Sequence, residues 1–318
     1  MKKHALGLIV GLLFGTAGAA DFPTAPVRIV VPVAAGGGLD GLARMLAPLL
    51  SKRWGGQPVI IENRPGVAGI TGASTVANAR PDGYTLLVAN DAIMVSNRYL
   101  YKSLPYNPDK DFEPVAMLVE ANQMVLANPS VQANDLKELV ALVQQNPGKY
   151  SYASYGVGSP PNLTIEALNK HENLDILDVA YKGVAPSMTA VLGGEVQLSV
   201  ASGAVAGKLL EAGRMKALAV ASPERDPKYP QVKTTVEMGY PDIQVSIWHS
   251  MYAPAGTPRE IVEKIAADVR EALKDPEFVQ KVPHFRVLAG GPAELAKRIA
   301  VDAKRMQGMI AVAGVKPQ

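Results

Sequence analysis

Residues 27–50 read VRIVVPVAAGGGLDGLARMLAPLL and join a short apolar run, a glycine-rich turn and an amphipathic segment. The run Val27–Val31 predicts a buried strand. The segment Asp40–Trp54 predicts a helix, because its leucines recur on one face. Strands and helices alternate in this order along the chain, which is typical of an α/β fold with helices on both faces of mostly parallel sheets. The leucines on that face are Leu42, Leu46, Leu49 and Leu50.

The alternation divides the chain into two lobes. In the first lobe, strands are expected at Val59–Ile61 and Thr85–Ala89. Two amphipathic helices near the end of the chain have no strand set of their own, so the chain is expected to return to the first lobe. The prediction is a first lobe of residues 21–121 and 250–318 and a second lobe of residues 122–249. They are joined by two crossings, near Ala116–Asn122 and near Trp248–Tyr252. Strands of the second lobe are expected at Met124–Ala127, Tyr150–Ala153, Leu177–Ala180, Val196–Val200 and Ala217–Val220.

The first twenty residues predict a cleaved secretory signal peptide. Lys2 and Lys3 precede an apolar stretch from Ala5 to Phe14, and small residues lead to Ala20. The apolar stretch is shorter than the ~20 residues that a membrane span needs. A retained anchor is the alternative. The mature protein is expected to be periplasmic, exported through the inner membrane.

Composition excludes several classes of function. The chain has 32 basic and 29 acidic residues, so it has no charge field suited to nucleic acid. It has no cysteine, which excludes thiol catalysis and thiolate metal sites. The histidines lack zinc-site spacing, and no nucleophile elbow or P-loop occurs. We therefore expect a binding protein without catalytic residues, metal or cofactor.

The turn at Gly36–Gly41 matches the pattern G-x-G-x-x-G and leaves an alternative open. Glu62 follows Gly41 by 21 residues, about where an acidic residue meets the ribose in dinucleotide sites. An exported dinucleotide- or anion-binding enzyme is therefore one hypothesis. Export away from the usual nicotinamide pool argues against it, and so does Asp40, whose charge would oppose a pyrophosphate. Backbone amides at such a turn suit a carboxylate equally well.

Two further loops support a clamp for a small anion. Residues 154–159, SYGVGS, and residues 181–187, YKGVAPS, each follow a predicted strand of the second lobe. Ligands of open α/β sheets bind at the carboxyl ends of strands. Two lobes with facing glycine loops and two crossings can close on a ligand.

Several blocks of sequence, in order, resemble one family. They include VRIVVPVAAGGGLD, QPVIIENRPGVAGITGA, RPDGYTLL, LPYNPDKDFEPVA, NPGKYSYAS, YKGVAPSM, LLEAGRMKALAV and APAGTPREIV. The chain resembles the Bug-type extracytoplasmic solute receptors of tripartite tricarboxylate transporters. The resemblance implies a type II periplasmic-binding fold (a venus flytrap), a small carboxylate ligand and the membrane permease subunits as partner. We expect a monomer. A ligand sensor that serves no transporter is the alternative.

The resemblance places the ligand between Val33–Asp40 and Ser154–Ser159, held largely by backbone amides and water. Family members often have other residues at several of these positions, and an aspartate is common where this chain has Ala201. Its absence predicts an acid without an α-amino group, unless Asp91 supplies the charge. The candidate ligand-binding residues are Val33, Ala35, Gly36, Gly37, Gly38, Leu39, Asp40, Asp91, Ser154, Tyr155, Gly156, Val157, Gly158, Ser159, Asn162, Tyr181, Ala201 and Trp248.

Overall fold

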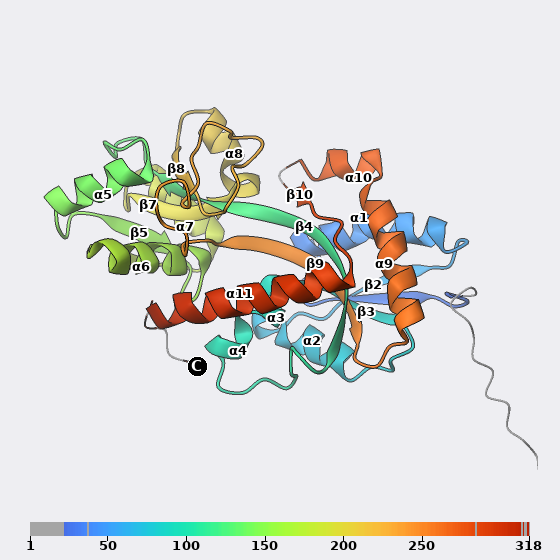
Figure 1. Ribbon diagram of the computed structural model, residues 1–318. Coiled ribbons are helices and arrows are strands. Elements are labelled where there is room, and N and C mark those ends of the chain that lie inside the picture. The colour runs from blue at the N-terminus through green and yellow to red at the C-terminus, as the bar shows by residue number, and fades with distance from the viewer. Residues whose placement is uncertain (1–21, 37, 284, 313, 315–316, 318) are drawn as a thin grey trace, which may run out of the picture.

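The computed structural model describes residues 22–36, 38–283, 285–312, 314 and 317. The predicted signal peptide lies outside the described residues. Two α/β lobes stand side by side and are joined by two long strands, β4 (Phe112–Ala127) and β9 (Ser246–Pro254) (Figure 1). Within the described part of the chain, no helix combines the length and the apolar character that crossing a bilayer requires.

Lobe 1 is built on three parallel strands, β1 (Val27–Val31), β2 (Val59–Asn63) and β3 (Thr85–Asn90). Alternate residues of β1 serve two cores: Ile29 packs on the face with α1, and Val30 packs on the opposite face. This period of two is what a central strand covered on both faces requires. The helical segments of this part of the chain are α1 (Gly38–Arg53), η2 (Val67–Gly69), α2 (Ile70–Ala77), α3 (Asp91–Met94) and α4 (Asn97–Leu100).

Lobe 2 repeats the plan. Strand β5 (Ser151–Ser154) pairs in parallel with β6 (Leu177–Ala180) and with β7 (Leu198–Ser202). Its first helix begins after Asp135, whose side chain accepts the N–H of Glu138 as an N-cap. The remaining elements are β8 (Lys216–Val220) and the helices α5 (Leu136–Gln145), α6 (Pro160–Glu172), α7 (Val184–Gly193) and α8 (Gly203–Glu211).

The two lobes share one connected sheet. Strand β4 (Phe112–Ala127) runs antiparallel to β9 (Ser246–Pro254) and then pairs with β7 and β8. The main strand order is β2-β1-β3-β9-β4-β7-β5-β6. The crossings that we expected near Ala116–Asn122 and Trp248–Tyr252 fall within these two strands.

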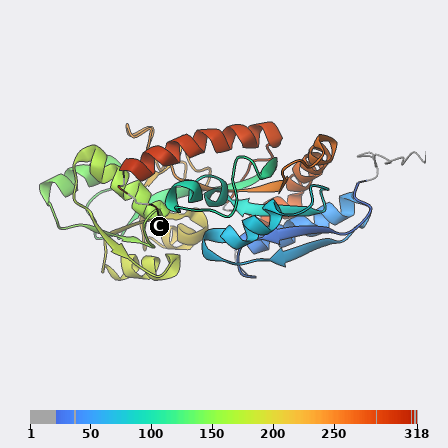
Figure 2. The ribbon, with the colours of Figure 1, turned by 90° about the horizontal axis from the view of Figure 1, so that it is seen from below.

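The last elements return towards lobe 1. Helix α9 (Arg259–Leu273) packs into the lobe 1 core, and α10 (Pro276–Lys281) and β10 (Arg286–Val287) follow it. Helix α11 (Pro292–Val312) runs along one side of the molecule past both lobes (Figure 2). Its Leu295 belongs to a lobe 1 core, whereas Met309 packs with residues of both lobes.

Candidate functional site

The topology directs two glycine-rich loops towards the junction of the lobes. Strand β9 enters lobe 1 with His249 opposite Asn90, so the carboxyl ends of β3 and its neighbour β1 face lobe 2. On the other side, Gln123 of β4 pairs with Ser202, so the carboxyl ends of β7 and β5 face lobe 1. The β1–α1 loop and the β5–α6 loop therefore lie at facing sheet edges. Strand ends of this kind are where α/β proteins bind ligands.

The candidate residues divide between these edges. The lobe 1 set lies after β1 and β3, and the lobe 2 set lies at or just after the carboxyl ends of β5, β6 and β7. Gly37 lies outside the described residues. The lobe 1 set is Val33, Ala35, Gly36, Gly38, Leu39, Asp40 and Asp91, and the lobe 2 set is Ser154, Tyr155, Gly156, Val157, Gly158, Ser159, Asn162, Tyr181 and Ala201.

The β1–α1 loop is held from behind by a buried carboxylate. The N–H of Gly36 donates to Asp40 Oδ2 at 2.8 Å. Asp40 also accepts bonds from Arg44 Nε at 2.9 Å and from Asn63 Nδ2 at 2.9 Å. The bonds from Arg44, Gly36 and Asn63 hold the pKa of Asp40 near 2, below its usual value. Asp40 is therefore an ionised brace at neutral pH, and its charge is paired with Arg44.

The β5–α6 loop is held by a neutral side chain in the same position. The N–H of Gly158 donates to Asn162 Oδ1 at 2.9 Å. The N–H of Gly156 donates to Ser154 Oγ at 3.2 Å. Gly156 and Gly158 have φ values of 111° and 79°, which side chains other than glycine rarely adopt. Glycine thus allows a tight turn in which side chains behind the loop hold two of its amides.

The lobes approach closely at this point. A Cβ atom added to Gly158 would lie 2.9 Å from Leu100 Cδ2 of α4, in the other lobe. Next to α4, burial of the Asp91 carboxyl group raises its pKa to about 7, and the charge of Asp302 adds to the effect. The pKa of Tyr155 is also raised, by burial and then by the charge of Asp91. The side chains of Asp91 in lobe 1 and Tyr155 in lobe 2 therefore influence each other.

A hollow opens beside the β1–α1 loop. It encloses about 370 Å³. Asn90 contributes a buried Oδ1 atom for which the described residues offer no hydrogen-bond partner. The hollow places this polar atom near the predicted loop. Its lining residues are Pro32, Val33, Ala34, Leu39, Pro65, Gly66, Ala68, Gly69, Asn90 and Ile93.

Three other candidates have defined surroundings. Trp248 lies on β9, which together with β4 joins the lobes and forms what we call the hinge. It has 1% of its surface exposed, and its Nε1–H donates to Asp302 Oδ2 at 2.8 Å. Tyr181 follows β6, and its hydroxyl donates to Glu195 at 2.9 Å. Ala201 is buried at the end of β7. Contact of these residues with a ligand stays a prediction.

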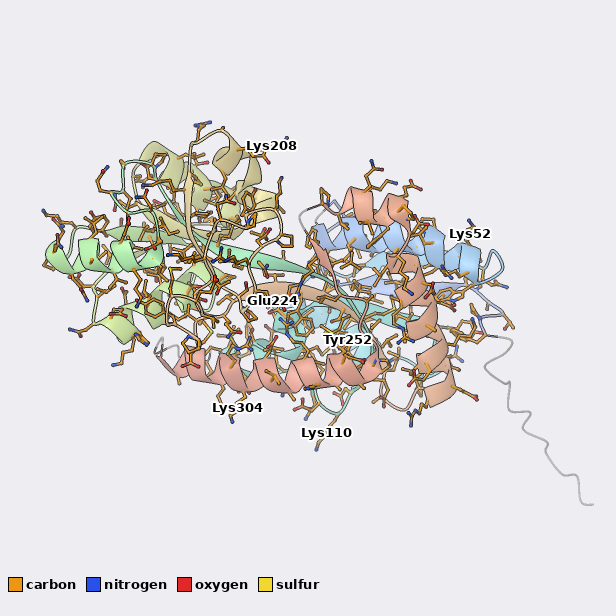
Figure 3. The ribbon with its side chains drawn as sticks, turned by 45° about the horizontal axis from the view of Figure 1, so that its top comes forward. Lys52, Lys110, Lys208, Glu224, Tyr252 and Lys304 are labelled. Carbon is orange, nitrogen blue, oxygen red and sulfur yellow. The ribbon has the colours of Figure 1, made fainter. Side chains whose placement is uncertain are left out.

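The hinge carries a charge network that the sequence did not suggest. Glu120 of β4, 4% exposed, accepts bonds from Arg286 and from Arg298 of α11. Arg298 also reaches Asp302, and Arg286 pairs with Glu224 at 2.8 Å. Figure 3 shows Glu224 over the junction between the lobes. The network connects the hinge strand, the C-terminal helix and a lobe 2 segment.

Asp40 and Asn162 each hold a loop amide, and we call them the braces of the two loops. Sequence reasoning missed the residues that bond to them. Asn63 at the end of β2 reaches Asp40, and Asp178 on β6 reaches Asn162. Each lies on the strand after the helix that carries the brace. Glu62, which a dinucleotide site would use, instead pairs with Arg28 at 3.0 Å. Among the described residues there is no group of three or more histidine, aspartate or glutamate side chains placed to hold a metal ion.

Comparison with known proteins gives a consistent result. Residues 42–315 match the family model described as the tripartite tricarboxylate transporter family receptor. The chain is 34% identical to a UPF0065 protein of Bordetella pertussis, covering 95% of this chain and 94% of that protein. It is 30% identical to Protein BugT of the same organism, covering 99% of each.

Solved structures show the same architecture. The periplasmic binding protein BugD has a TM-score of 0.74 at 34% identity, covering 93% of this chain and 100% of that one. Rhodopseudomonas palustris Rpa4515 with adipate has a TM-score of 0.78 at 31% identity, covering 94% and 100%. MatC from the same organism with bound malate has a TM-score of 0.73 at 34% identity, covering 91% and 100%. The predicted two-lobed type II periplasmic-binding fold is confirmed.

Proposed function

Because the chain belongs to the tripartite tricarboxylate transporter receptor family, as its sequence resemblance predicted, we propose that it captures a small organic carboxylate between its lobes and delivers it to permease subunits of that transporter class. Members of the family are periplasmic solute-binding proteins, and the structures of two relatives contain adipate and malate. The observation that carries the proposal is the pair of braced glycine loops, one on each lobe, at facing sheet edges.

The loops suit an anion through backbone groups. The N-terminal ends of α1 and α6 lie beside them, and helix N-termini carry partial positive charge and free N–H groups. Neither residues 32–40 nor residues 154–159 contain lysine or arginine. Hydrogen bonds to a charged group contribute about 1.5–3 kcal/mol each. Under the proposal, a few such bonds from loop amides other than those of Gly36, Gly156 and Gly158, which donate to side chains, would supply the ~8 kcal/mol that micromolar affinity requires.

The substrate class within the proposal is an acid without an α-amino group. Ala201 offers no counter-charge for an ammonium group, and an unpaired buried charge is costly. A longer or flatter dicarboxylate suits two facing anion loops better than aspartate does. Asp91 is the residue that can reverse this preference, because it is a carboxyl group at the junction whose charge influences the pKa of Tyr155.

Calorimetric titration tests the proposal. Adipate, malate, succinate, citrate, nicotinate, terephthalate, aspartate, glutamate and NADH form the panel. We expect an acid without an amino group to bind most tightly, and small-angle scattering with that acid to give a smaller radius of gyration. Binding of NADH alone, weakened by Glu62→Gln, would support the exported enzyme instead. Tight binding of an amino acid that Asp91→Asn abolishes would make Asp91 the ammonium partner.

Export is part of the proposal. The mature protein is expected in the periplasm with its N-terminus near Asp21, after cleavage of residues 1–20. N-terminal sequencing of protein from the periplasmic fraction checks this. A mature chain that still begins at Met1 would contradict it and would favour the retained anchor.

A further inference from the structure

The side-chain amide of Asn162 is occupied on both sides. It is the third residue of α6 and only 5% exposed. Its Oδ1 accepts the N–H of Gly158 at 2.9 Å. Its Nδ2 donates to Asp178 Oδ2 at 3.1 Å and to the Tyr152 hydroxyl at 3.3 Å. An amide nitrogen has two N–H donors, so both donors of Asn162 are used within lobe 2.

Asp178 determines which way this amide points. Asp178 Oδ2 accepts a hydrogen bond from Asn162 Nδ2, so the NH₂ group of Asn162 faces Asp178. Tyr152 supports the same orientation, because its hydroxyl donates to Glu166 at 2.8 Å and leaves its oxygen to accept. A flipped amide would set oxygen against the Asp178 carboxylate and NH₂ against the N–H of Gly158. The carboxylate on β6 therefore turns the Asn162 oxygen towards the loop.

Lobe 1 contains the same hydrogen-bond arrangement, with aspartate and asparagine in exchanged positions. Asp40 is the third residue of α1 and accepts the N–H of Gly36, and Asn63 of the following strand donates to Asp40. In both lobes the brace accepts an N–H from four residues earlier, and its partner comes from the next strand. The two lobes reach one geometry with opposite placements of aspartate and asparagine.

We propose that Asn162 and Asp178 are a positioning pair that holds the β5–α6 loop in its ligand-binding conformation. Asn162 acts through the Gly158 amide and does not touch the ligand, although its sequence position predicted contact. Asp178 fixes the orientation of Asn162 from behind. The inference rests on the proposed function, because it assigns these residues to the binding of a carboxylate at this loop.

The test combines affinity with the exchange of one amide proton. Asn162→Leu keeps the branched shape of the side chain and removes the acceptor, so carboxylate affinity should fall at least about tenfold. Protection of the Gly158 N–H from hydrogen exchange, followed by NMR, should fall with it. Asp178→Asn releases the amide orientation, so the same two quantities should fall by a smaller factor, about threefold.

A matched control lies on the same helix. Asn169 Oδ1 accepts the N–H of Ile176 at 3.1 Å, and its Nδ2 donates to the Ile176 carbonyl at 3.0 Å and, at a longer 3.5 Å, to Glu166 Oε1. Asn169→Leu should lower the melting temperature while leaving affinity and Gly158 protection unchanged. Circular dichroism confirms that each variant is folded at the titration temperature.

The outcomes separate this inference from the proposed function. A wild-type protein that binds no carboxylate of the panel overturns both. Wild-type binding that Asn162→Leu leaves intact overturns the positioning pair alone. Loss of binding in Asn162→Leu with the Gly158 N–H still protected also overturns it, because Asn162 would then contact the ligand directly.

Discussion

In lobe 1 the loop amide of Gly36 is held by ionised Asp40, whereas in lobe 2 the loop amide of Gly158 is held by neutral Asn162. Asp40 is neutralised by Arg44. The carboxylate of lobe 2, Asp178, stands one side chain further from the loop. The comparison teaches that a carboxylate beside either loop is compatible with the proposed anion binding, because it lies behind the loop and holds its backbone in place.

The largest expected effect on stability comes from giving lobe 2 the aspartate that holds the loop amide in lobe 1. Asn162→Asp sets a carboxylate at about hydrogen-bond distance from Asp178, without an arginine such as Arg44. The like charges should lower the free energy of unfolding by about 3 kcal/mol at pH 8. Urea unfolding measures the loss.

The reciprocal exchange is the control for that prediction. In Asn162→Asp with Asp178→Asn, the amide of residue 178 donates to the new carboxylate, as Asn63 does to Asp40. Most of the lost stability should return. Because one of two adjacent carboxyl groups protonates on acidification, the single variant should also recover at pH 5. A double variant as unstable as the single one would show that the two lobes do not share this hydrogen-bond arrangement.

The next effect concerns Asp40 and depends on pH. Asp40→Asn keeps an acceptor for the Gly36 N–H but loses the ionic bonds with Arg44, so stability at pH 7 should fall by about 2 kcal/mol. The pKa of Asp40 is lowered to about 2, so its contribution is present above about pH 4 and is lost as pH falls towards 2.

Denaturant unfolding at several pH values checks this. The difference between wild type and Asp40→Asn should shrink between pH 4 and pH 2. Asn162→Leu gives the comparison, since a neutral brace has no carboxyl group of its own to protonate. A difference for Asp40→Asn that is constant down to pH 2 would contradict an ionised brace.

Much of the fold was predictable because local patterns determine it. The leucine stripe of α1 depends on residues within a few helical turns, and it occurs in the structure. The loops were found for the same reason, since each directly follows a strand. The partners Asn63 and Asp178 were missed because they lie 23 and 16 residues from their braces and meet them only through strand pairing.

The hinge was harder to predict for a related reason. Strand β4 extends from Phe112 to Ala127 and includes Pro114 and Glu120, which interrupt its apolar pattern. The sequence predicts a strand only for its last part, Met124–Ala127. Likewise, the apolar stripe of α11 predicts a buried helix face but does not say that Leu295 and Met309 pack in different cores.

A smaller effect comes from Asp91, a carboxyl group at the same junction that lacks the ionic brace of Asp40. Its pKa is raised to about 7, so the folded state holds a proton that the unfolded state releases near pH 4. Ionisation of Asp91 therefore lowers the free energy of unfolding. This loss grows from pH 4 to pH 7 and does not change further above pH 7. Asp91→Asn should be more stable than wild type at pH 8, by less than the ~4 kcal/mol to which a pKa rise from 3.8 to about 7 corresponds because the asparagine amide is also buried, and equal to it near pH 4.

Thermal unfolding across this pH range tests the sign. Asp40→Asn serves as the opposite case, because it should be less stable than wild type at pH 8. If Asp91→Asn were also less stable at pH 8, the Asp91 carboxylate would have a favourable partner in the folded protein. That result would favour its role as a binding group for a cationic ligand.

The smallest effect separates the two glycines themselves. Gly36 and Gly158 both have positive φ, 88° and 79°, so alanine strains both loops by a similar amount. A Cβ at Gly36 meets nothing within 4 Å, whereas one at Gly158 would lie 2.9 Å from Leu100 Cδ2. The end of a leucine side chain can move, so the extra cost of Gly158→Ala should be only about 0.5–1 kcal/mol.

This extra cost should arise at the contact between lobes. In a Leu100→Ala background, Gly158→Ala and Gly36→Ala should therefore have equal effects on stability, as a double-mutant cycle measured by urea unfolding would show. Under the proposed function the lobes separate for a ligand to enter, and this separation would remove the Leu100 contact in the open form. Gly158→Ala should thus weaken the closed form specifically and lower carboxylate affinity more than Gly36→Ala does. Equal affinities for the two variants would mean that Leu100 stays against the loop in the open form as well, so that the contact belongs to the hinge and not to closure.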